Sequence, residues 1–426
     1  MSAGEDAVIG HVSANEWISR CQNNAMQLIP EGCRDIIQLQ AKKWFLRKFL
    51  SIPGGGAFTF ATAGHLMMMQ YLCAENPRID MDETSGFDVD EAPSCQGELV
   101  YSDENGTKRS VFGRIPFEGV VGVSMGALFA LLLGVGLSIP EALAQMSIES
   151  SEGVHNMIDI VGLLTQRKGV CNLQSLIDRI GTFLKTCGFA PDITVSEVFR
   201  ETGVWFAAGI ARLGLHPKPQ QLLVSPVLHG DWPAAKVVAM SMAYPGLFSP
   251  WYMSEYPGSA MVDGGVARNI PDNYFEPAET IIYAYLPEES PLLNPSHSGV
   301  EVFAAVCSAL LPSFRGQYFE HTLPYRASNM CPIIIYKEAS AVTPSVGRSE
   351  QLNLFDDGCA SAVAWLLREE IAKMTIYALV KLRQLEEHCE EQENQEDEVD
   401  NEEESETVEN VIDVDDDVDL SFQPSL

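Results

Sequence analysis

The apolar positions of the chain fall into two kinds of block. Short runs rich in Val, Ile and Tyr, bounded by turn residues, predict buried strands at 49–52, 119–123, 222–225, 281–285 and 333–336. Longer stretches of helix-forming residues predict helices at 14–48, 57–74, 125–133, 236–242 and 358–388. Helices are also expected within 140–188, whereas 195–211 fits either an amphipathic helix or a strand. Strands that alternate with helices predict an α/β fold, in which helices cover both faces of a mostly parallel central sheet.

The stretch 119–140 carries no charged residue, and it is long enough to cross a membrane as a helix. Its first five residues are valine-rich and broken by glycine, however, and the residues after Ser124 favour a helix. A buried strand, a sharp turn and a buried helix explain the same apolarity without a membrane. We therefore expect no membrane-spanning helix in this stretch.

A polar segment at 76–112 interrupts the pattern before the strand at 119–123. Within it, Asn105-Gly106 lies between two short apolar runs, which is a strong signal for a β-hairpin. We interpret the segment as a surface excursion, with a lid or a partner-binding surface as the alternative.

Charge divides the chain into two parts. Of its 59 acidic residues, 19 lie in 386–419, where no lysine or arginine occurs, so much of the formal net charge of −32 is concentrated near the end. A segment of this composition cannot bury enough apolar surface to offset its conformational entropy. We predict a helical flank at 1–48, one α/β domain at 49–388 and a disordered acidic tail at 389–426.

The composition also limits the partners and the compartment. Binding to nucleic acid needs clustered lysine and arginine, and the chain has one short basic cluster, at 42–48. We interpret that cluster as a solvated helix face, with contact to an anionic membrane as the alternative. The ten cysteines have no spacing typical of metal sites or a disulfide framework, so we expect reduced thiols and neither metal nor cofactor. The acidic first residues lack the apolar core of a secretory signal, which favours a cytoplasmic protein.

A serine that hydrolyses acyl esters needs an exposed hydroxyl, a base and donors for the oxyanion. Gly122-Val123-Ser124-Met125-Gly126 can supply the hydroxyl. Gly122 and Gly126 would let a strand and a helix approach closely around a sharp turn, so that Ser124 projects at the helix N-terminus. The strand predicted before this pentapeptide and the helix predicted after it fit that geometry.

A glycine run, Gly54-Gly55-Gly56 followed by Ala57, lies between the first predicted strand and its helix. Consecutive glycines leave backbone N–H groups unshielded, and the helix N-terminus adds positive potential. The run lacks the Lys-Ser/Thr pair of a P-loop and the spacing of a dinucleotide fingerprint. We interpret it as an oxyanion hole, with a phosphate-binding turn or a tight connection as the alternatives.

The candidate base is Asp263, which ends a short apolar run and precedes Gly264 and Gly265. An Asp-Gly-Gly turn alone is ordinary loop chemistry. The glycine run, the serine pentapeptide and this turn, however, occur in the order and approximate spacing of the patatin-like phospholipase family. The resemblance covers about 49–370 and includes further segments at 50–57, 243–250, 266–271 and 358–362.

The resemblance implies a mechanism and a substrate class. In that family a Ser–Asp dyad works without histidine, so Asp263 would deprotonate Ser124 and later activate water. The substrates would be acyl esters of phospholipids or glycerolipids, hydrolysed without calcium or a cofactor and reached by peripheral contact with a membrane. One departure is that the family often has Arg-Gly where this chain has Phe58 and Thr59, which bears on the geometry of the oxyanion loop.

A Ser-His-Asp triad is the competing design. It would place a histidine after Asp263, at His297 or His321, and neither has a recognisable loop signature. His65 is expected to pack on a helix, and His229 is expected in a turn. The methionine run at 67–69 either lines a flexible acyl-chain pocket or packs in the core.

The acidic tail holds one further motif. Val411, Ile412 and Val414, followed by three aspartates, resemble a SUMO-interacting motif, in which a β-branched run adds a strand to a partner's sheet. A solvated tail with incidental valines is the alternative. The competing function for the whole chain is thus a catalytically weak patatin-like scaffold that acts through its tail.

Overall fold

The computed structural model describes residues 11–74, 100–102, 108–152, 169–287, 330–335 and 346–368, apart from 31, 46, 111, 116 and 215–217. The chain divides into two compact units, 1–367 and 368–426, and the fold described below is that of the first. The acidic tail with its Val411–Val414 motif, His297 and His321 lie outside the described residues. None of the helices in the described ranges combines the length and apolarity that a membrane crossing needs.

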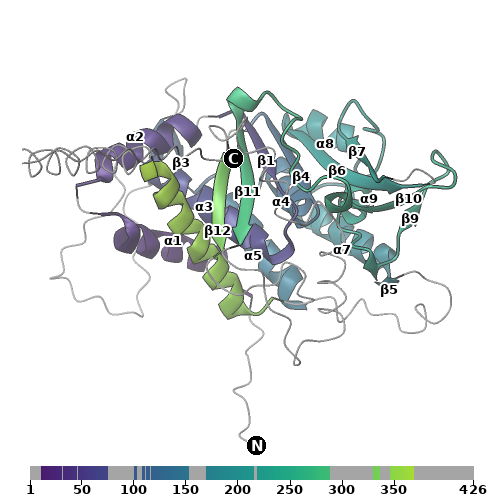
Figure 1. The fold of residues 1–426 in the computed structure, drawn as a ribbon, viewed down its shortest axis with the longest axis horizontal. Coiled ribbons are helices and arrows are strands. Elements are labelled where there is room, and N and C mark those ends of the chain that lie inside the picture. The colour runs from purple at the N-terminus through teal and green to yellow at the C-terminus, as the bar shows by residue number, and fades with distance from the viewer. Residues whose placement is uncertain are drawn as a thin grey trace, which may run out of the picture. The chain divides into compact units, whose positions relative to one another are not determined.

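A central sheet of eight described strands positions the candidate site (Figure 1). Five neighbouring strands run parallel, in the order β12 (Met330–Ile335), β11 (Thr280–Pro287), β1 (Phe49–Ile52), β4 (Gly119–Val123) and β6 (Trp205–Leu213). The other three strands are antiparallel to their neighbours, namely β7 (Gln220–Val224) and β10 (Ala260–Asp263) on β6, and β9 (Trp251–Tyr252) on β10. This sheet, flanked by helices, confirms the predicted α/β class.

The helices pack with the sheet into one continuous apolar core. α3 (Thr59–Leu72) follows β1 through the short turn η1 (Gly56–Phe58), and α4 (Met125–Gly134) follows β4 directly. Both helices are buried on nearly every side, which explains why their sequences are apolar without helical periodicity. The other helices in the described part of the chain are α1 (Ala14–Leu28), α2 (Arg34–Phe45), α5 (Ile139–Glu152), α7 (Leu173–Thr186), α8 (Val195–Thr202), α9 (Ala234–Ser241) and a helix over 348–368.

Two glycines allow α3 and the helix over 348–368 to touch backbone to backbone. A Cβ atom on Gly64 would lie 2.2 Å from the Phe355 carbonyl oxygen, and one on Gly358 would lie 2.0 Å from the Ala61 carbonyl oxygen. Since real Cβ atoms do not approach other atoms this closely, only glycine fits at either position in this packing.

Several predicted elements differ in their limits from those observed. The helix predicted over 14–48 is two helices, because the chain turns at Pro30 and Gly32, where Gly32 has a φ of +81°. The ambiguous segment 195–211 contains a helix and most of a strand, separated at Gly203, which ends α8 with a φ of +73°. The last helix begins at 348, ten residues earlier than predicted.

The short strands outside the central sheet include one that the sequence pattern did not indicate. β5 (Gly169–Cys171) lies within a region predicted as helical, and it pairs in parallel with β8 (Gly246–Phe248). The predicted hairpin is confirmed, because β2 (Val100–Ser102) pairs antiparallel with β3 (Lys108–Ser110).

Candidate active site

One edge of β6 brings Ser124 and Asp263 together. β4 runs parallel to β6 and ends at Val123, opposite Gly209. β10 runs antiparallel to β6 and ends at Asp263, opposite Ile210. Both strands occupy the same edge of β6, since β7 pairs with residues 208–212 from the other side. The carboxyl ends of β4 and β10 therefore meet head to head, and Ser124 follows directly at the junction.

Ser124 occupies a strained turn between β4 and α4. Its φ of 55° and ψ of −131° are unusual for a residue with a side chain, and Ser124 is one of two non-glycine residues with positive φ in the described part of the chain. The glycines around it permit the turn. A Cβ atom on Gly122 would lie 2.2 Å from the Gly126 carbonyl oxygen, and one on Gly126 would lie 2.4 Å from the Pro53 carbonyl oxygen. This arrangement leaves Ser124 half-buried rather than enclosed.

The Ser124 hydroxyl donates a hydrogen bond of 2.6 Å to Oδ2 of Asp263. The other carboxylate oxygen accepts a 2.8 Å bond from the N–H of Gly265. Burial raises the pKa of the Asp263 carboxyl from its ordinary 3.8 to about 6, although these two hydrogen bonds favour the ionised form. At neutral pH the pair is therefore a hydroxyl facing a desolvated carboxylate, which is the arrangement of a nucleophile with its base.

The end of α9 holds the backbone of both residues. The N–H of Ser124 donates to Oγ of Ser241 at 2.9 Å, and that hydroxyl donates in turn to the carbonyl oxygen of Gly209 at 2.6 Å. Two residues later, the carbonyl oxygen of Ala243 accepts a 2.9 Å bond from the N–H of Asp263. The hydroxyl of the buried Ser241 thus connects the turn at Ser124 to β6.

The glycine run lies directly beside Ser124. A Cβ atom on Gly54 would lie 3.1 Å from Cβ of Ser124. The N–H of Gly54 donates to the carbonyl oxygen of Asn269 at 3.1 Å, so this N–H is already occupied. Gly55 and Gly56 are half-buried, and among the described residues no acceptor is found for their N–H groups or for that of Ala57. Gly56 has a φ of +51°, which a residue with a side chain would adopt only with strain.

Phe58 occupies the position at which the resemblance noted above leads us to expect arginine. It is buried beneath the glycine run and packs edge-on against Tyr285, with ring centroids 5.5 Å apart. The same Tyr285 ring lies under Gly55, where a Cβ atom would meet it at 2.3 Å, and its hydroxyl is 2.7 Å from Oγ1 of Thr62. In the described part of the chain, aromatic packing and no cationic side chain is found against the loop at this position.

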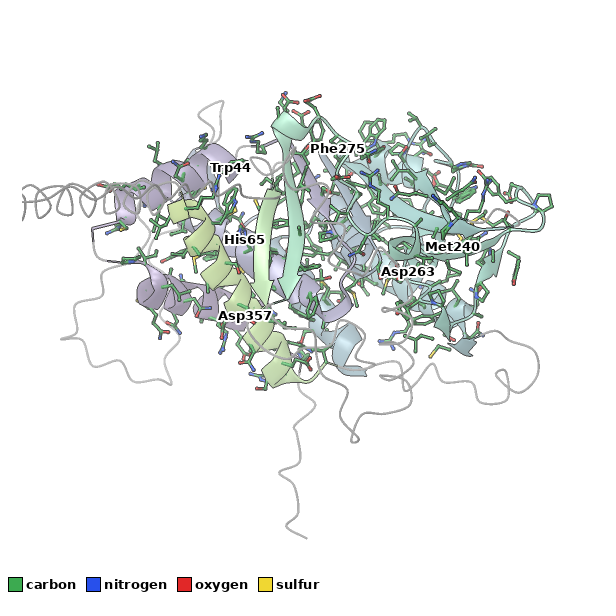
Figure 2. All side chains as sticks on the ribbon, viewed as in Figure 1. Trp44, His65, Met240, Asp263, Phe275 and Asp357 are labelled. Carbon is green, nitrogen blue, oxygen red and sulfur yellow. The ribbon has the colours of Figure 1, made fainter. Side chains whose placement is uncertain are left out.

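The described histidines lie apart from the dyad. His65 is fully buried in α3, beside Tyr283 and Trp365, and burial lowers its pKa to about 3. Figure 2 shows it well separated from Asp263. His229, in a turn with a φ of 60°, stacks on Trp232 and bonds the Tyr256 hydroxyl. None of the three described histidines, the exposed His11 included, is hydrogen-bonded to Asp263 or Ser124.

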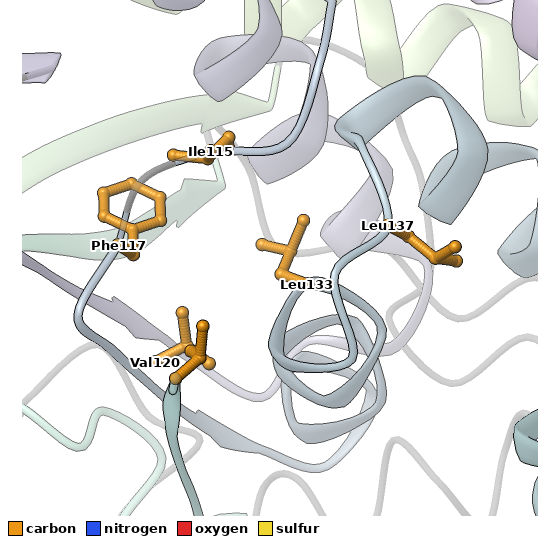
Figure 3. A pocket seen from close by; sticks show the side chains of 6 residues that line it. Ile115, Phe117, Val120, Leu133 and Leu137 are labelled. Atoms are coloured by element: carbon orange, nitrogen blue, oxygen red, sulfur yellow. The ribbon is translucent and has the colours of Figure 1, made fainter. Parts of the chain in front are cut away.

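The methionine run and the apolar recess in Figure 3 do not form an acyl-chain site at the dyad. Met67, Met68 and Met69 are fully buried in α3, which supports the core-packing interpretation. The recess is lined by Ile115, Phe117, Val120, Leu133, Leu137 and Val204. It lies near the amino end of β4 and the carboxyl end of α4, whereas Ser124 lies at the opposite end of both elements.

Two residues of this geometry were not identified as site residues from the sequence. Ser241 was not singled out, and Asn269 entered only as part of a segment that resembles the family. Their partners lie 117 and 215 residues away along the chain, so no local pattern could have indicated the contacts. Serine at a helix end and asparagine in a loop are also common in unrelated settings.

Comparison with known proteins gives a match to the part of the chain that contains Ser124 and Asp263. Residues 112–275 match the family model described as patatin-like phospholipase. A crystal structure of VipD from Legionella pneumophila is similar with a TM-score of 0.41 and 14% identity, covering 75% of this chain and 66% of that one. The type III effector protein ExoU has a TM-score of 0.33 and 15% identity, with coverage of 76% and 53%. The chain thus spans less than two thirds of either structure. A search of curated protein sequences found no match.

Proposed function

We propose that the protein is a lipid acyl hydrolase in which Ser124 is the nucleophile and Asp263 is the base, and the match of residues 112–275 to the patatin-like phospholipase model supports this class of activity. The observation that carries the proposal is the 2.6 Å hydrogen bond from the Ser124 hydroxyl to Oδ2 of Asp263. The substrates proposed are fatty-acyl esters of phospholipids or glycerolipids, reached by peripheral contact with a lipid surface.

The first half of the reaction forms an acyl-enzyme. Oγ of Ser124 attacks the ester carbonyl carbon while its proton passes to Oδ2 of Asp263, and the carbonyl oxygen becomes an oxyanion. When the tetrahedral intermediate collapses, the bond to the alcohol oxygen breaks and Asp263 returns its proton to that oxygen. The lysolipid or partial glyceride then leaves, and the fatty acyl group stays on Ser124.

The second half repeats these steps with water. Asp263 accepts a proton from a water molecule, whose oxygen attacks the acyl carbon, and the collapsing intermediate releases the fatty acid and restores the Ser124 hydroxyl. No histidine is needed, because one carboxylate with a pKa of about 6 serves as base and then as acid in each half.

The N–H groups of Gly55 and Gly56 are the proposed oxyanion donors, with Ala57 as a further candidate. They follow the residue that touches Ser124, and they have no acceptor among the described residues. Gly54 is left out, because its N–H is bonded to Asn269. The N-terminus of α3 beyond the run adds positive potential to the same region.

The test is fatty-acid release from phospholipid vesicles by wild type, Ser124→Ala and Asp263→Asn, with Ser254→Ala as a control at an exposed serine. Wild type and Ser254→Ala should release fatty acid, and the two dyad variants should not. Equal release by wild type and Ser124→Ala would overturn the proposal. If wild type neither releases fatty acid nor reacts at Ser124 with a fluorophosphonate probe, the scaffold function through the tail becomes the better account.

A further inference from the structure

The segment that follows Asp263 returns to the end of β1. After the turn η3 (Gly264–Val266), it forms three hydrogen bonds with residues 51–54. The Ser51 hydroxyl donates to the carbonyl oxygen of Pro271 at 2.9 Å. The N–H of Gly54 donates to the carbonyl oxygen of Asn269 at 3.1 Å, and Nδ2 of Asn269 donates to the carbonyl oxygen of Gly54 at 2.7 Å. Both backbone polar groups of Gly54 are therefore bonded to a single residue.

Asn269 and Ser124 both lie close to the position that a side chain on Gly54 would occupy, so no side chain fits there. A Cβ atom on Gly54 would lie 2.4 Å from Oδ1 of Asn269 and 3.1 Å from Cβ of Ser124. The two hydrogen bonds between Gly54 and Asn269 therefore limit how far this part of the glycine run can move relative to the nucleophile. Asn269 is also only six residues beyond Asp263, so one short segment carries both the base and this contact.

We propose that Asn269 is a positioning residue that fixes the glycine loop against Ser124 and leaves the N–H groups of Gly55 and Gly56 to bind the oxyanion. Asn269 does not touch the reacting atoms in this role. It determines which peptide groups of the loop are free, because it occupies both groups of Gly54. The catalytic part of this inference rests on the proposed function. The two hydrogen bonds between Asn269 and Gly54, which we call the clamp, do not depend on it.

The kinetic test compares Asn269→Asp with Asn269→Ala. Aspartate has nearly the same shape but puts an oxygen where Nδ2 donates, so it opposes the Gly54 carbonyl instead of bonding it. Ser51→Ala is the matched control, because it removes a buried hydrogen bond between the same two segments without touching Gly54. Both Asn269 variants should lose kcat by about 100-fold with KM changed by less than about threefold, as expected for a misplaced oxyanion loop. Ser51→Ala should retain kcat.

The pH profile separates this role from an effect on the base. Since Asn269 makes no bond to Asp263, the acid limb of the profile should stay at the wild-type pH in the Asn269 variants. An equal loss of kcat in Ser51→Ala and in both Asn269 variants would mean that the contact is merely structural, and it would overturn the inference. Unchanged kcat in Asn269→Asp would overturn it as well.

Amide hydrogen exchange tests the clamp independently of activity. Exchange at Gly54–Gly56 should be faster in Asn269→Asp than in wild type and unchanged in Ser51→Ala. If wild type hydrolyses no lipid but the loop responds in this way, the proposed function fails while the clamp stands. If exchange in the loop is the same in wild type and Asn269→Asp, the inference fails whatever the activity.

Discussion

At the scale of single residues, the mechanism proposed above makes the ionisation of Asp263 set the working pH. The carboxyl is fully buried, and burial raises its pKa to about 6. The base must be ionised to accept the Ser124 proton, so kcat/KM should fall as the pH drops through about 6 and level off above it. A pH–rate profile with a water-soluble ester measures this limb.

The temperature dependence of that limb identifies the base. A carboxyl group ionises with little heat and an imidazole with much more, so the limb should stay at the same pH when the assay is warmed. A limb that moves to lower pH on warming would indicate a histidine base and would contradict the dyad.

The same burial makes Asp263 costly to the fold at neutral pH. Its folded pKa of about 6 is higher than its ordinary value of 3.8, so between these values the folded state binds a proton that the unfolded state lacks. Stability from this group is therefore present below the lower value and lost as the pH rises through about 6. Asparagine keeps the shape and can bond both Ser124 and Gly265, so at pH 7.5 Asp263→Asn should raise the free energy of unfolding by up to about 3 kcal/mol while abolishing hydrolysis.

Denaturant unfolding at two pH values measures this gain. The advantage of Asp263→Asn should shrink at pH 5, where wild-type Asp263 is itself protonated. Asp192→Asn, at an exposed position, should change little at either pH. If Asp263→Asn is less stable than wild type at pH 7.5, burial of the Asp263 charge is not the dominant cost to the stability of the fold.

That Ser124 and Asp263 lie side by side could be predicted, because each lies in a motif that local chemistry makes recognisable. Gly122 and Gly126 mark a turn with close backbone approach, and Gly264 and Gly265 follow the carboxylate. Neither Ser241 nor Asn269 could be assigned a role in the same way, because their roles exist only once distant segments of the sheet are side by side. Likewise, which N–H of the glycine run is free depends on Asn269 and not on the run itself.

At the scale of elements, the contact between α3 and the helix over 348–368 gives the sharpest prediction. Alanine favours a helix over glycine by about 1 kcal/mol, so propensity alone predicts that Gly358→Ala stabilises the protein. The new Cβ would lie 2.0 Å from the Ala61 carbonyl oxygen, however, and backbone cannot yield as a side chain can. We expect a net loss of about 1–3 kcal/mol in the free energy of unfolding, because overpacking outweighs propensity.

Gly347→Ala is the matched control for this prediction. A Cβ atom added at Gly347 would have no heavy atom within 4 Å, and Gly347 is not among the glycines with positive φ. Denaturant unfolding should find this variant within about 0.5 kcal/mol of wild type. Gly358→Ala at or above wild-type stability would mean that the two helices can separate without cost.

The elements themselves could be predicted where the apolar pattern was strong. Predictions were wrong where a turn residue or a distant strand determines the boundary of an element. β1, β4 and β11 are short apolar runs, and their strands are confirmed. The break between α1 and α2 depends on Pro30 and Gly32. The apolar pattern continues on both sides of these residues, so the pattern alone does not reveal the break. β5 is only three residues long and exists because β8 pairs with it, so its sequence alone carries no strand signal.

At the scale of the whole molecule, net charge should influence which lipid surfaces are attacked. With a formal charge of −32, the protein is repelled from anionic bilayers at low salt, and the repulsion is screened at high salt. Fatty-acid release should therefore be slower from vesicles rich in phosphatidylglycerol than from phosphatidylcholine vesicles, and added salt should narrow the difference. Hydrolysis of a water-soluble ester should not respond to salt in the same way.

Preference for anionic vesicles at low salt would contradict this expectation. It would indicate that a local basic surface outweighs the total charge, and the exposed Lys42 and Lys43 of α2 would be the first residues to replace.

The head-to-head meeting of β4 and β10 on β6 has a consequence for how the protein acquires reactivity as it folds. Ser124 and Asp263 are 139 residues apart in the chain, and their strands do not pair with each other, so each takes its place only from the register of β6. In the proposed mechanism the serine has no base until β10 has docked, which requires long-range strand pairing of the kind that forms slowly. The rate at which a fluorophosphonate probe begins to react during refolding therefore reports closure of the sheet, not collapse of the chain.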